Sequence, residues 1–445
     1  GIATDDTTKQ FFAEIMGSGA LVSLFELENE GFFLGAGQGH MVRFALTTLR
    51  GPVSDNATAL FLFQGKDVNE IREEDRTFAL TAEDLVLLNP NTRTCPIFRT
   101  RRDAEITKGI YRRVPVLIRE GPPEENPWGI SFLRMFDMTS DSHLFRTRAD
   151  LEAHGWQLEG NVFVRGGERY LPLYEAKMIS LFNHRFGDFS DGPEGQRAHI
   201  LPEVPESRLG DPNYQPLPFY WVPSTEVNAQ LGAYPHRWLV GFRGITDSRA
   251  SARSVIIGVF PRAGVGNSLP ILHIPGHTSS LVACLTAVLS GFVLDYVARS
   301  KIAGLNLNFF IMKQLPVLPA EALMRPCPWD AACSTVVDWL LPRILELTYT
   351  SWDLVSFARD CGYEGPPFAW NEERRFRLRC ELDAAFFHLY GIGPEDVEYI
   401  METFPIVKRR DEEQFGEYRT KTHILAMYEA LAAGAKTQTE CPGEL

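Results

Sequence analysis

The chain has 445 residues, of which 44% are apolar and 23% are charged, a composition typical of globular proteins with sizeable cores. The length predicts two or three domains. Its 44 basic and 57 acidic side chains give a net charge of −13, which excludes a protein that holds nucleic acid through bulk positive charge but is compatible with a local basic patch.

Residues 1–105 alternate between helical and strand-like patterns, which is typical of an α/β domain. Apolar spacing predicts a helix over Lys9–Met16 and a short element over Thr81–Asn89. Three strands are predicted, at Ala20–Leu27, His40–Leu49 and Thr58–Gln64. The turn-rich link Arg50–Asn56 predicts that the last two of these strands form a hairpin.

Residues 93–119 are the most basic part of this acidic chain. Only Asp103 and Glu105 oppose the eight basic side chains of the segment. These are Arg93, Arg99, Arg101, Arg102, Lys108, Arg112, Arg113 and Arg119. Such a concentration favours contact with phosphate groups, and a solvated basic face is the alternative.

The pattern changes twice beyond residue 120. Residues 120–275 are rich in proline, glycine and aromatic residues, and an exposed loop is predicted over 190–218. Short strands are predicted in this part at Asn161–Val164, Trp238–Arg243 and Ser254–Phe260. Residues 278–301 predict one apolar helix, which polar side chains within Leu281–Ala298 mark as buried rather than membrane-spanning. Further helices are predicted at Ser334–Leu347, Glu372–Leu389 and Thr420–Ala433.

Cysteine and histidine spacing bears on location and on metals. Seven cysteines without a CxxC pair favour a reducing compartment over a disulfide scaffold or a zinc ribbon. His273 and His277 have the spacing of a metal pair, but the Pro-Gly between them favours a turn, so no metal site is expected. No secretory signal is expected. Because the chain begins with Gly1, we expect either processing or a piece of a longer protein.

Two short motifs imitate catalytic ones. Gly35-Ala-Gly37-Gln-Gly39 resembles a cofactor loop, but strand-like residues follow it where such a loop needs a helix start, so a glycine link between two strands is preferred. Asp211-Pro-Asn-Tyr214 departs at Asn213 from the Asp/Asn-Pro-Pro-Tyr/Phe motif of amino-methyltransferases, and an ordinary turn is preferred. The residues alone assemble no catalytic constellation.

Seven segments, taken in order, carry a resemblance that spans nearly the whole chain. They are Gly1-Ile-Ala-Thr-Asp-Asp-Thr-Thr-Lys-Gln-Phe-Phe12, Leu87–Arg99, Arg134–Arg146, Tyr170–Met178, Leu305–Pro316, Glu381–Gly391 and Thr403–Arg410, the last running on to Lys421. Together they resemble type IIG-like restriction–modification enzymes, which are bacterial DNA adenine-N6 methyltransferases.

The resemblance implies three parts. Residues 1–105 would be an α/β methyltransferase-core remnant with Rossmann-like strands and a hairpin, 106–320 a mixed α+β target-recognition domain, and 321–445 a helical C-terminal region. Members carry an S-adenosylmethionine loop and an Asn-Pro-Pro-Tyr motif before the segment that begins here. Since this sequence has neither, the resemblance implies a C-terminal half that is inactive by itself.

The same resemblance implies the partners. The N-terminal methyltransferase half, in cis or as a separate chain, would bind most of the S-adenosylmethionine. Double-stranded DNA would be the substrate, no membrane would be involved, and the location would be the bacterial cytoplasm.

The resemblance also implies site residues. Phe33, with Phe32 as the alternative, would stack on the flipped-out adenine, because an aromatic ring restores the stacking that a flipped base loses. Candidate phosphate contacts between core and recognition domain are Arg99, Arg101, Arg102, Arg112 and Arg113, with Lys313 further along. Candidates in the recognition domain are Lys177, Arg185, Arg243, Arg249, Arg253, Arg262 and Asn267, since arginine and asparagine read guanine and adenine edges.

Three other hypotheses stay open. The chain could be a non-catalytic DNA-specificity subunit that works with a separate methyltransferase chain. It could be a self-sufficient methyltransferase with degenerate motifs, using Phe33–Gly39 as cofactor loop and Asp211–Tyr214 as catalytic loop. It could also be an α/β protein that binds no nucleic acid, which the net charge of −13 favours.

Overall fold

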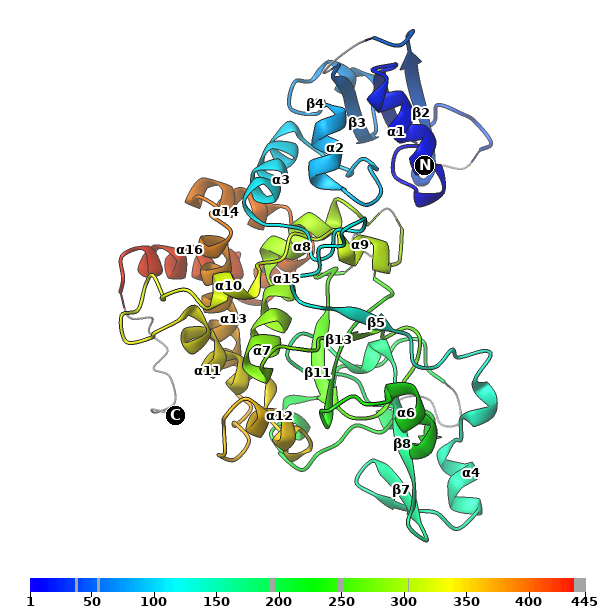
Figure 1. Cartoon of the computed structure of the whole chain (residues 1–445), viewed down its shortest axis with the longest axis vertical. Helices are drawn as coiled ribbons and strands as arrows, with labels where there is room; N and C mark the ends of the chain where they lie inside the picture. The colour runs from blue at the N-terminus through cyan, green and yellow to red at the C-terminus, as the bar shows by residue number, and fades with distance from the viewer. Residues whose placement is uncertain (37–38, 54–56, 192–196, 247–250, 303, 436–445) are drawn as a thin grey trace.

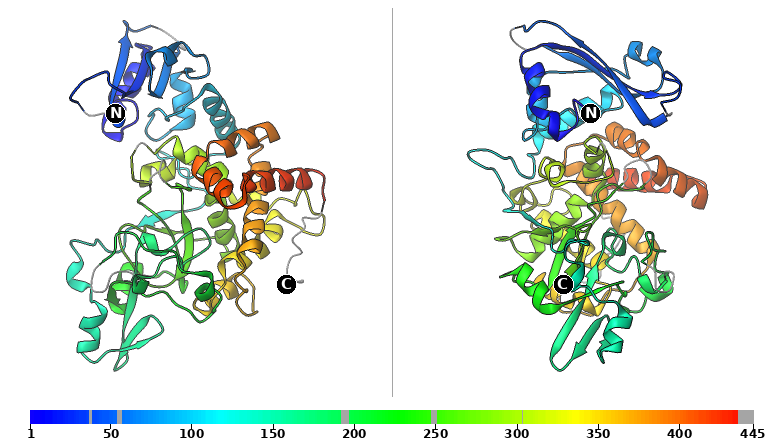
Figure 2. Two further views of the ribbon diagram at one scale, coloured as in Figure 1. Left: turned by 180° about the vertical axis from the view of Figure 1, so that it is seen from behind. Right: turned by 90° about the vertical axis from the view of Figure 1, so that its right-hand side faces the viewer.

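The computed structural model describes residues 1–36, 39–53, 57–191, 197–246, 251–302 and 304–435. We divide the chain into a first lobe (1–113), a second lobe (114–278) and a helical region (279–435). The first lobe lies at one end of the molecule in all three views (Figures 1 and 2). The chain is therefore mixed α/β with several sheets and a helical C-terminal region, as the sequence predicts in general terms.

The first lobe is a four-stranded sheet with helices beside it. Its strands are β1 (Leu21–Asn29), β2 (Gly39–Leu49), β3 (Ala59–Gly65) and β4 (Phe78–Leu80), and its helices are α1 (Lys9–Gly17), α2 (Ala82–Leu88) and α3 (Arg101–Arg113). The sheet order is β2-β1-β3-β4. β1 pairs antiparallel with β2 and parallel with β3.

The predicted hairpin between the second and third strands is therefore wrong. β1 lies between them, and the true hairpin joins β1 to β2 through the loop that holds Phe33. The reason is burial: β1 is largely buried along its length, as suits a central strand, whereas the far end of β2 is exposed.

Helix α3 crosses the predicted boundary at residue 105 and lies within the basic segment. A reciprocal capping box starts it: the Thr100 hydroxyl accepts from the Asp103 amide (3.1 Å), and the Asp103 carboxylate accepts from the Thr100 amide (3.0 Å). Asp103 also accepts from the hydroxyls of Tyr296 (2.8 Å) and Tyr399 (3.1 Å). The first lobe is thereby attached to the helical region.

The second lobe contains two sheets and a hydrophobic core of its own, and it also contributes Trp238, Val240 and Val259 to the larger core that includes the helical region. One sheet has the order β11-β10-β13-β5; the other has the order β12-β8-β7-β6, with β9 on β8. The strands are β5 (Ser131–Leu133), β6 (Gln157–Glu159), β7 (Val162–Arg165), β8 (Glu168–Tyr174), β9 (Trp221–Pro223), β10 (Trp238–Phe242), β11 (Ile257–Pro261), β12 (Gly264–Val265) and β13 (Ile271–His273). The short helices are α4 (Arg148–Ala153), α5 (Glu206–Leu209) and α6 (Ser224–Leu231).

The helical region begins earlier than residue 321, because α7 packs against α11 and α8 against α13. Its helices are α7 (Ser279–Leu289), α8 (Phe292–Arg299), α9 (Phe309–Lys313), α10 (Ala320–Leu323), α11 (Val336–Thr348), α12 (Val355–Asp360), α13 (Glu372–Leu389), α14 (Pro394–Glu402), α15 (Pro405–Phe415) and α16 (Arg419–Ala432).

The single helix predicted over 278–301 is two helices, bent by 53°. Asp383 accepts a hydrogen bond from the Phe292 amide (2.7 Å) and so caps the start of the second helix. A Cβ at Gly291 would lie 2.9 Å from the Phe386 ring, so the break permits close packing on α13. In the part of the chain that the structure describes, no single helix is long and apolar enough to cross a membrane, although this bent pair passes by length and composition alone.

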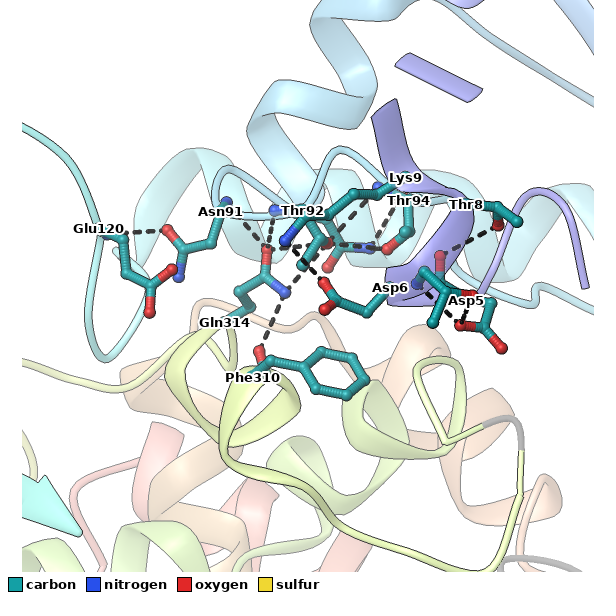
Figure 3. A network of polar contacts seen from close by, with 12 residues as sticks. Asp5, Asp6, Thr8, Lys9, Asn91, Thr92, Thr94, Glu120, Phe310 and Gln314 are labelled. Carbon is teal, nitrogen blue, oxygen red and sulfur yellow. Dashed lines mark hydrogen bonds and ion pairs between the residues drawn. The ribbon is translucent and has the colours of Figure 1, made fainter. Parts of the chain in front are cut away.

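Segments that carry the family resemblance meet where the first lobe contacts the helical region. The buried Gln314 carbonyl oxygen accepts from the amides of Asn91 (3.0 Å) and Thr92 (3.2 Å), and its amide group donates to the Phe310 carbonyl (3.0 Å), as Figure 3 shows. The Lys301 ammonium donates to the Leu88 carbonyl (2.6 Å), and burial holds its pKa well below the usual value. These segments therefore join the first lobe to the helical region.

Candidate functional site

The loop between β1 and β2 carries an exposed apolar tip. Phe32 is 40% exposed, Phe33 54% and Leu34 91%. Gly31 and Gly35 flank the tip with φ of 93° and 82°, a left-handed backbone that side chains other than glycine rarely adopt. The glycines flanking the phenylalanines therefore shape the turn that presents them.

The buried Asn29, the last residue of β1, fixes Phe33 from both sides. Its side-chain oxygen accepts from the Phe33 amide (2.8 Å), and its side-chain nitrogen donates to the Phe33 carbonyl (3.0 Å). Phe44 on β2 lies edge-on to both rings, at 5.3 Å from Phe32 and 4.8 Å from Phe33 between ring centroids. The result is an exposed aromatic pair on a fixed backbone.

Asn29 and Phe44 were not predicted as site residues from the sequence. An Asn directly before Glu-Gly-Phe-Phe at the end of a strand is a signal for side-chain bonding to the loop backbone. Phe44 lies within the predicted strand, but its contact with the Phe32 and Phe33 rings depends on the pairing of β2 with β1, whereas the sequence predicted pairing with β3.

β2 lies at the end of the sheet order, and in the described ranges β1 is the one strand that pairs with it. Residues 45–50 are all exposed, with Leu46 at 48% and Leu49 at 53%. A long apolar edge strand with unpaired backbone groups can accept a further strand. The exposed Phe33 loop lies at the start of this edge.

The glycines after Phe33 do not fit a cofactor loop. The described residues that follow form β2, a strand, and no helix N-terminus is present there to receive a phosphate or carboxylate. The Asp211 motif is a turn in which Asp211 accepts from the Asn213 amide (2.9 Å), and Tyr214 donates to Asp188 on the neighbouring segment. Neither motif therefore supplies an S-adenosylmethionine site among these residues.

The five predicted phosphate contacts of the basic segment divide into two groups. Arg99, Arg101 and Arg112 are exposed, and among the described residues the one hydrogen bond of their side chains is a long one from Arg101 to the Thr77 carbonyl (3.4 Å). Arg102 bridges to Asp396 (3.0 Å) and lies over the Tyr399 ring, and Arg113 donates to the Tyr390 carbonyl (2.9 Å). The first three are available to a ligand, whereas Arg102 and Arg113 join α3 to the helical region.

Arg185 is the clearest correction among the predicted base-reading residues. It is fully buried, and its guanidinium donates to the carbonyls of Asp211 (2.8 Å), Leu209 (2.8 Å) and Thr350 (3.1 Å). Burial lowers its pKa. In this fold it joins three loop segments in the interior and is not exposed for contact with a base.

Two further predicted arginines brace the interior. Arg243 donates to the Ile179 carbonyl (2.9 Å), and burial lowers its pKa to about 10. Arg253 forms an ion pair with the buried Asp295 (2.8 Å). Asp295 also accepts a hydrogen bond from the Ser254 amide (2.8 Å), so Ser254 is not part of a sheet and the predicted strand begins at Ile257 instead.

The other candidates of this group are partly exposed and engaged. Lys177 bonds the Ala198 carbonyl and lies 3.4 Å from Glu175, and burial lowers its pKa. Arg262 donates to Asn228 (3.0 Å), and Asn267 donates to Asp137 (2.7 Å). Lys313 pairs with Glu120. Arg249 lies outside the described residues.

The histidine pair forms a turn at Gly276, where φ is 84°, and His277 packs on the Trp128 ring with 4.8 Å between centroids. Within the described ranges no group of three or more His, Cys, Asp or Glu residues could hold a metal ion.

No protein-family model matches the chain, and no curated protein matches it closely enough to serve as a relative.

Proposed function

We propose that this chain is the C-terminal, DNA-recognising part of a site-specific DNA adenine-N6 methyltransferase of a bacterial restriction–modification or phage-defence system. The first lobe would complete the methyltransferase core, and the second lobe would be the target-recognition domain. The N-terminal methyltransferase half, in cis or as a separate chain, would hold S-adenosylmethionine. This chain's own residues would bind the DNA and the flipped base.

The observation that carries the proposal is the fixed, half-exposed Phe33. An enzyme that modifies a base inside a duplex must take it out of the stack, and an aromatic ring compensates for the lost stacking by about 1–3 kcal/mol per base. Phe33 is the preferred platform over Phe32, because Asn29 bonds both its amide and its carbonyl. Phe32 is also the less exposed of the two.

The open edge of β2 supports the second part of the proposal. A strand of the N-terminal half would pair with the backbone of Gly39–Leu49 and cover Leu46 and Leu49. Docking at this edge would place the N-terminal half next to the Phe33 loop, which lies between β1 and β2. An adenine held against Phe33 would then lie close to the cofactor.

Methyl transfer to adenine in the reconstituted enzyme tests the proposal. We expect Phe33→Ala to lower kcat/KM by about 5- to 150-fold, the range that corresponds to the loss of 1–3 kcal/mol of stacking. Phe33→Trp should restore most of the activity, and Phe32→Ala should have a smaller effect. Full activity of Phe33→Ala would refute the assignment.

A second candidate is the non-catalytic DNA-specificity subunit, which the absence of a cofactor loop among the described residues favours. The two candidates differ in whether Phe33 takes part in the reaction. If Phe33→Ala leaves methylation unchanged while the chain still co-purifies with a methyltransferase chain and confers sequence choice, the second candidate holds.

A further inference from the structure

A pocket of about 520 Å³ lies at the tip of the second lobe, between α4, the β7–β8 hairpin and the start of α6. Figure 1 shows α4 and β7 at the end of the molecule opposite the first lobe. Three arginines line it, Arg146 on one side and Arg165 and Arg169 on the hairpin. None of the three was predicted as a site residue from the sequence.

The pocket has an excess of available cationic groups. Arg169 is exposed, and its side chain has no hydrogen bond or ion pair among the described residues. Arg165 donates through one terminal nitrogen to the His154 carbonyl, and Arg146 donates through one terminal nitrogen to the carbonyls of His143 and Phe145 (both 2.8 Å). A guanidinium has five N–H donors, so both arginines keep donors for a ligand.

The two carboxylates of the pocket do not cancel this excess. Asp150 accepts from the amide (3.0 Å) and hydroxyl (2.7 Å) of Thr147, and these hydrogen bonds lower its pKa. Glu168 is the second carboxylate, directly opposite Arg165 across the hairpin. Three guanidiniums therefore face two carboxylates, of which one is engaged in capping α4.

The remaining wall adds neutral donors. Ser224 and Thr225, the first two residues of α6, line the pocket, and Pro223 before them offers no side-chain cap. The amides at the start of this helix therefore add donors beside the arginines. Planar guanidiniums, hydroxyls and helix amides in one pocket are the donor set that recognises a phosphate group.

We infer that this pocket binds a phosphodiester of the DNA strand, which anchors the tip of the second lobe at a distance from the Phe33 loop. The inference rests on the proposed function. A base is the less suitable occupant, because Arg165 lies 4.7 Å over the Trp156 ring and Tyr170 meets the same ring edge-on at 4.7 Å. The contact is to the backbone and so adds affinity for every sequence.

The test uses the full chain and a fluorescent DNA duplex, with Kd measured by anisotropy over a range of salt concentrations. Because one phosphate contact contributes about 0.9 to the slope of log Kd against log salt, Arg165→Ala with Arg169→Ala should lower that slope by about one. The double variant should also bind about tenfold more weakly at 0.1 M salt, to cognate and unrelated duplexes alike. Arg148→Ala is the matched control, because Arg148 lies on α4, pairs with Glu152 and does not line the pocket.

If the wild type binds the duplex and the double variant keeps its affinity and slope, the pocket inference is overturned while the proposed function stands. If the double variant does not fold, Arg169→Ala alone gives the same test with half the change. If the wild type binds no duplex, the proposed function fails, and inorganic pyrophosphate is then titrated against thermal unfolding. If pyrophosphate stabilises the wild type but not the double variant, the pocket binds free phosphate groups and DNA is overturned as their source. If pyrophosphate stabilises neither protein, the pocket does not bind phosphate and the inference is overturned.

Discussion

Replacing Asn29 by alanine should release the Phe33 loop without unfolding the lobe. The side chain makes one hydrogen bond to the Phe33 amide and one to its carbonyl, at 2.8 and 3.0 Å. At about 0.5–1.5 kcal/mol each, their loss weakens the ordered loop by about 1–3 kcal/mol. Since 1.4 kcal/mol is a factor of ten, the open population should rise by about 5- to 150-fold.

Amide hydrogen exchange followed by mass spectrometry measures this directly on the peptide that covers residues 30–36. Exchange in Asn29→Ala should speed up by the same factor, and the effect should stay local to the loop. Asn29→Asp is the matched variant: it keeps an acceptor for the Phe33 amide and loses the donor to the Phe33 carbonyl, so an intermediate rate is expected. Unchanged exchange in Asn29→Ala would refute the view that this residue fixes the aromatic pair.

Three further predictions follow from buried and exposed charges. Burial raises the pKa of Asp383 to about 6, so the folded state binds this proton more tightly than the unfolded chain and stability falls as pH rises from about 4 to 6. The free energy of unfolding of Asp383→Asn, measured with urea and taken relative to that of the wild type, should therefore rise by about 2 kcal/mol between pH 4.5 and 7.5. If this difference between variant and wild type does not change with pH, the prediction is contradicted. Arg185→Met should lower the unfolding free energy by about 3 kcal/mol, because it leaves buried carbonyls without donors, whereas a loss below about 0.5 kcal/mol would contradict its structural role. Arg99→Glu with Arg112→Glu should weaken duplex binding several-fold in gel shift at low salt. Arg102→Ala, which removes an exposed ion pair, should leave duplex binding nearly unchanged and change stability by less than about 1 kcal/mol, and an equal loss of DNA binding in both variants would refute the division between them.

Local pattern predicted many elements of this fold. The strand predicted over His40–Leu49 is β2, and Glu372–Leu389 is a helix over the predicted residues. Pairing was not predictable in the same way, because the turn-rich link after β2 favours a hairpin locally, whereas the buried β1 takes the central place in the sheet. The break at Gly291 likewise depends on Phe386 and Asp383, which lie about 90 residues further along the chain.

The candidate site shows the same limit. Arg185 and Arg243 were predicted to read bases because they are arginines, but residue type does not distinguish an arginine that bonds buried carbonyls from one that contacts DNA. The pocket arginines Arg165 and Arg169 flank a Gly-Gly turn, a local signal that could have drawn attention to the tip. Exposure and partners, which only the fold supplies, separate these cases.

If this acidic chain binds duplex DNA through local basic groups, as we propose, a salt titration of duplex binding by the full wild-type chain should show it. We expect measurable binding at low salt that weakens steeply as salt is added, with log Kd rising against log salt by about 0.9 for each phosphate contact. A slope of at least two is expected, from the exposed arginines of the basic segment and from the tip pocket. Absence of binding at 50 mM salt, or binding that salt does not change, would contradict DNA binding through these basic groups.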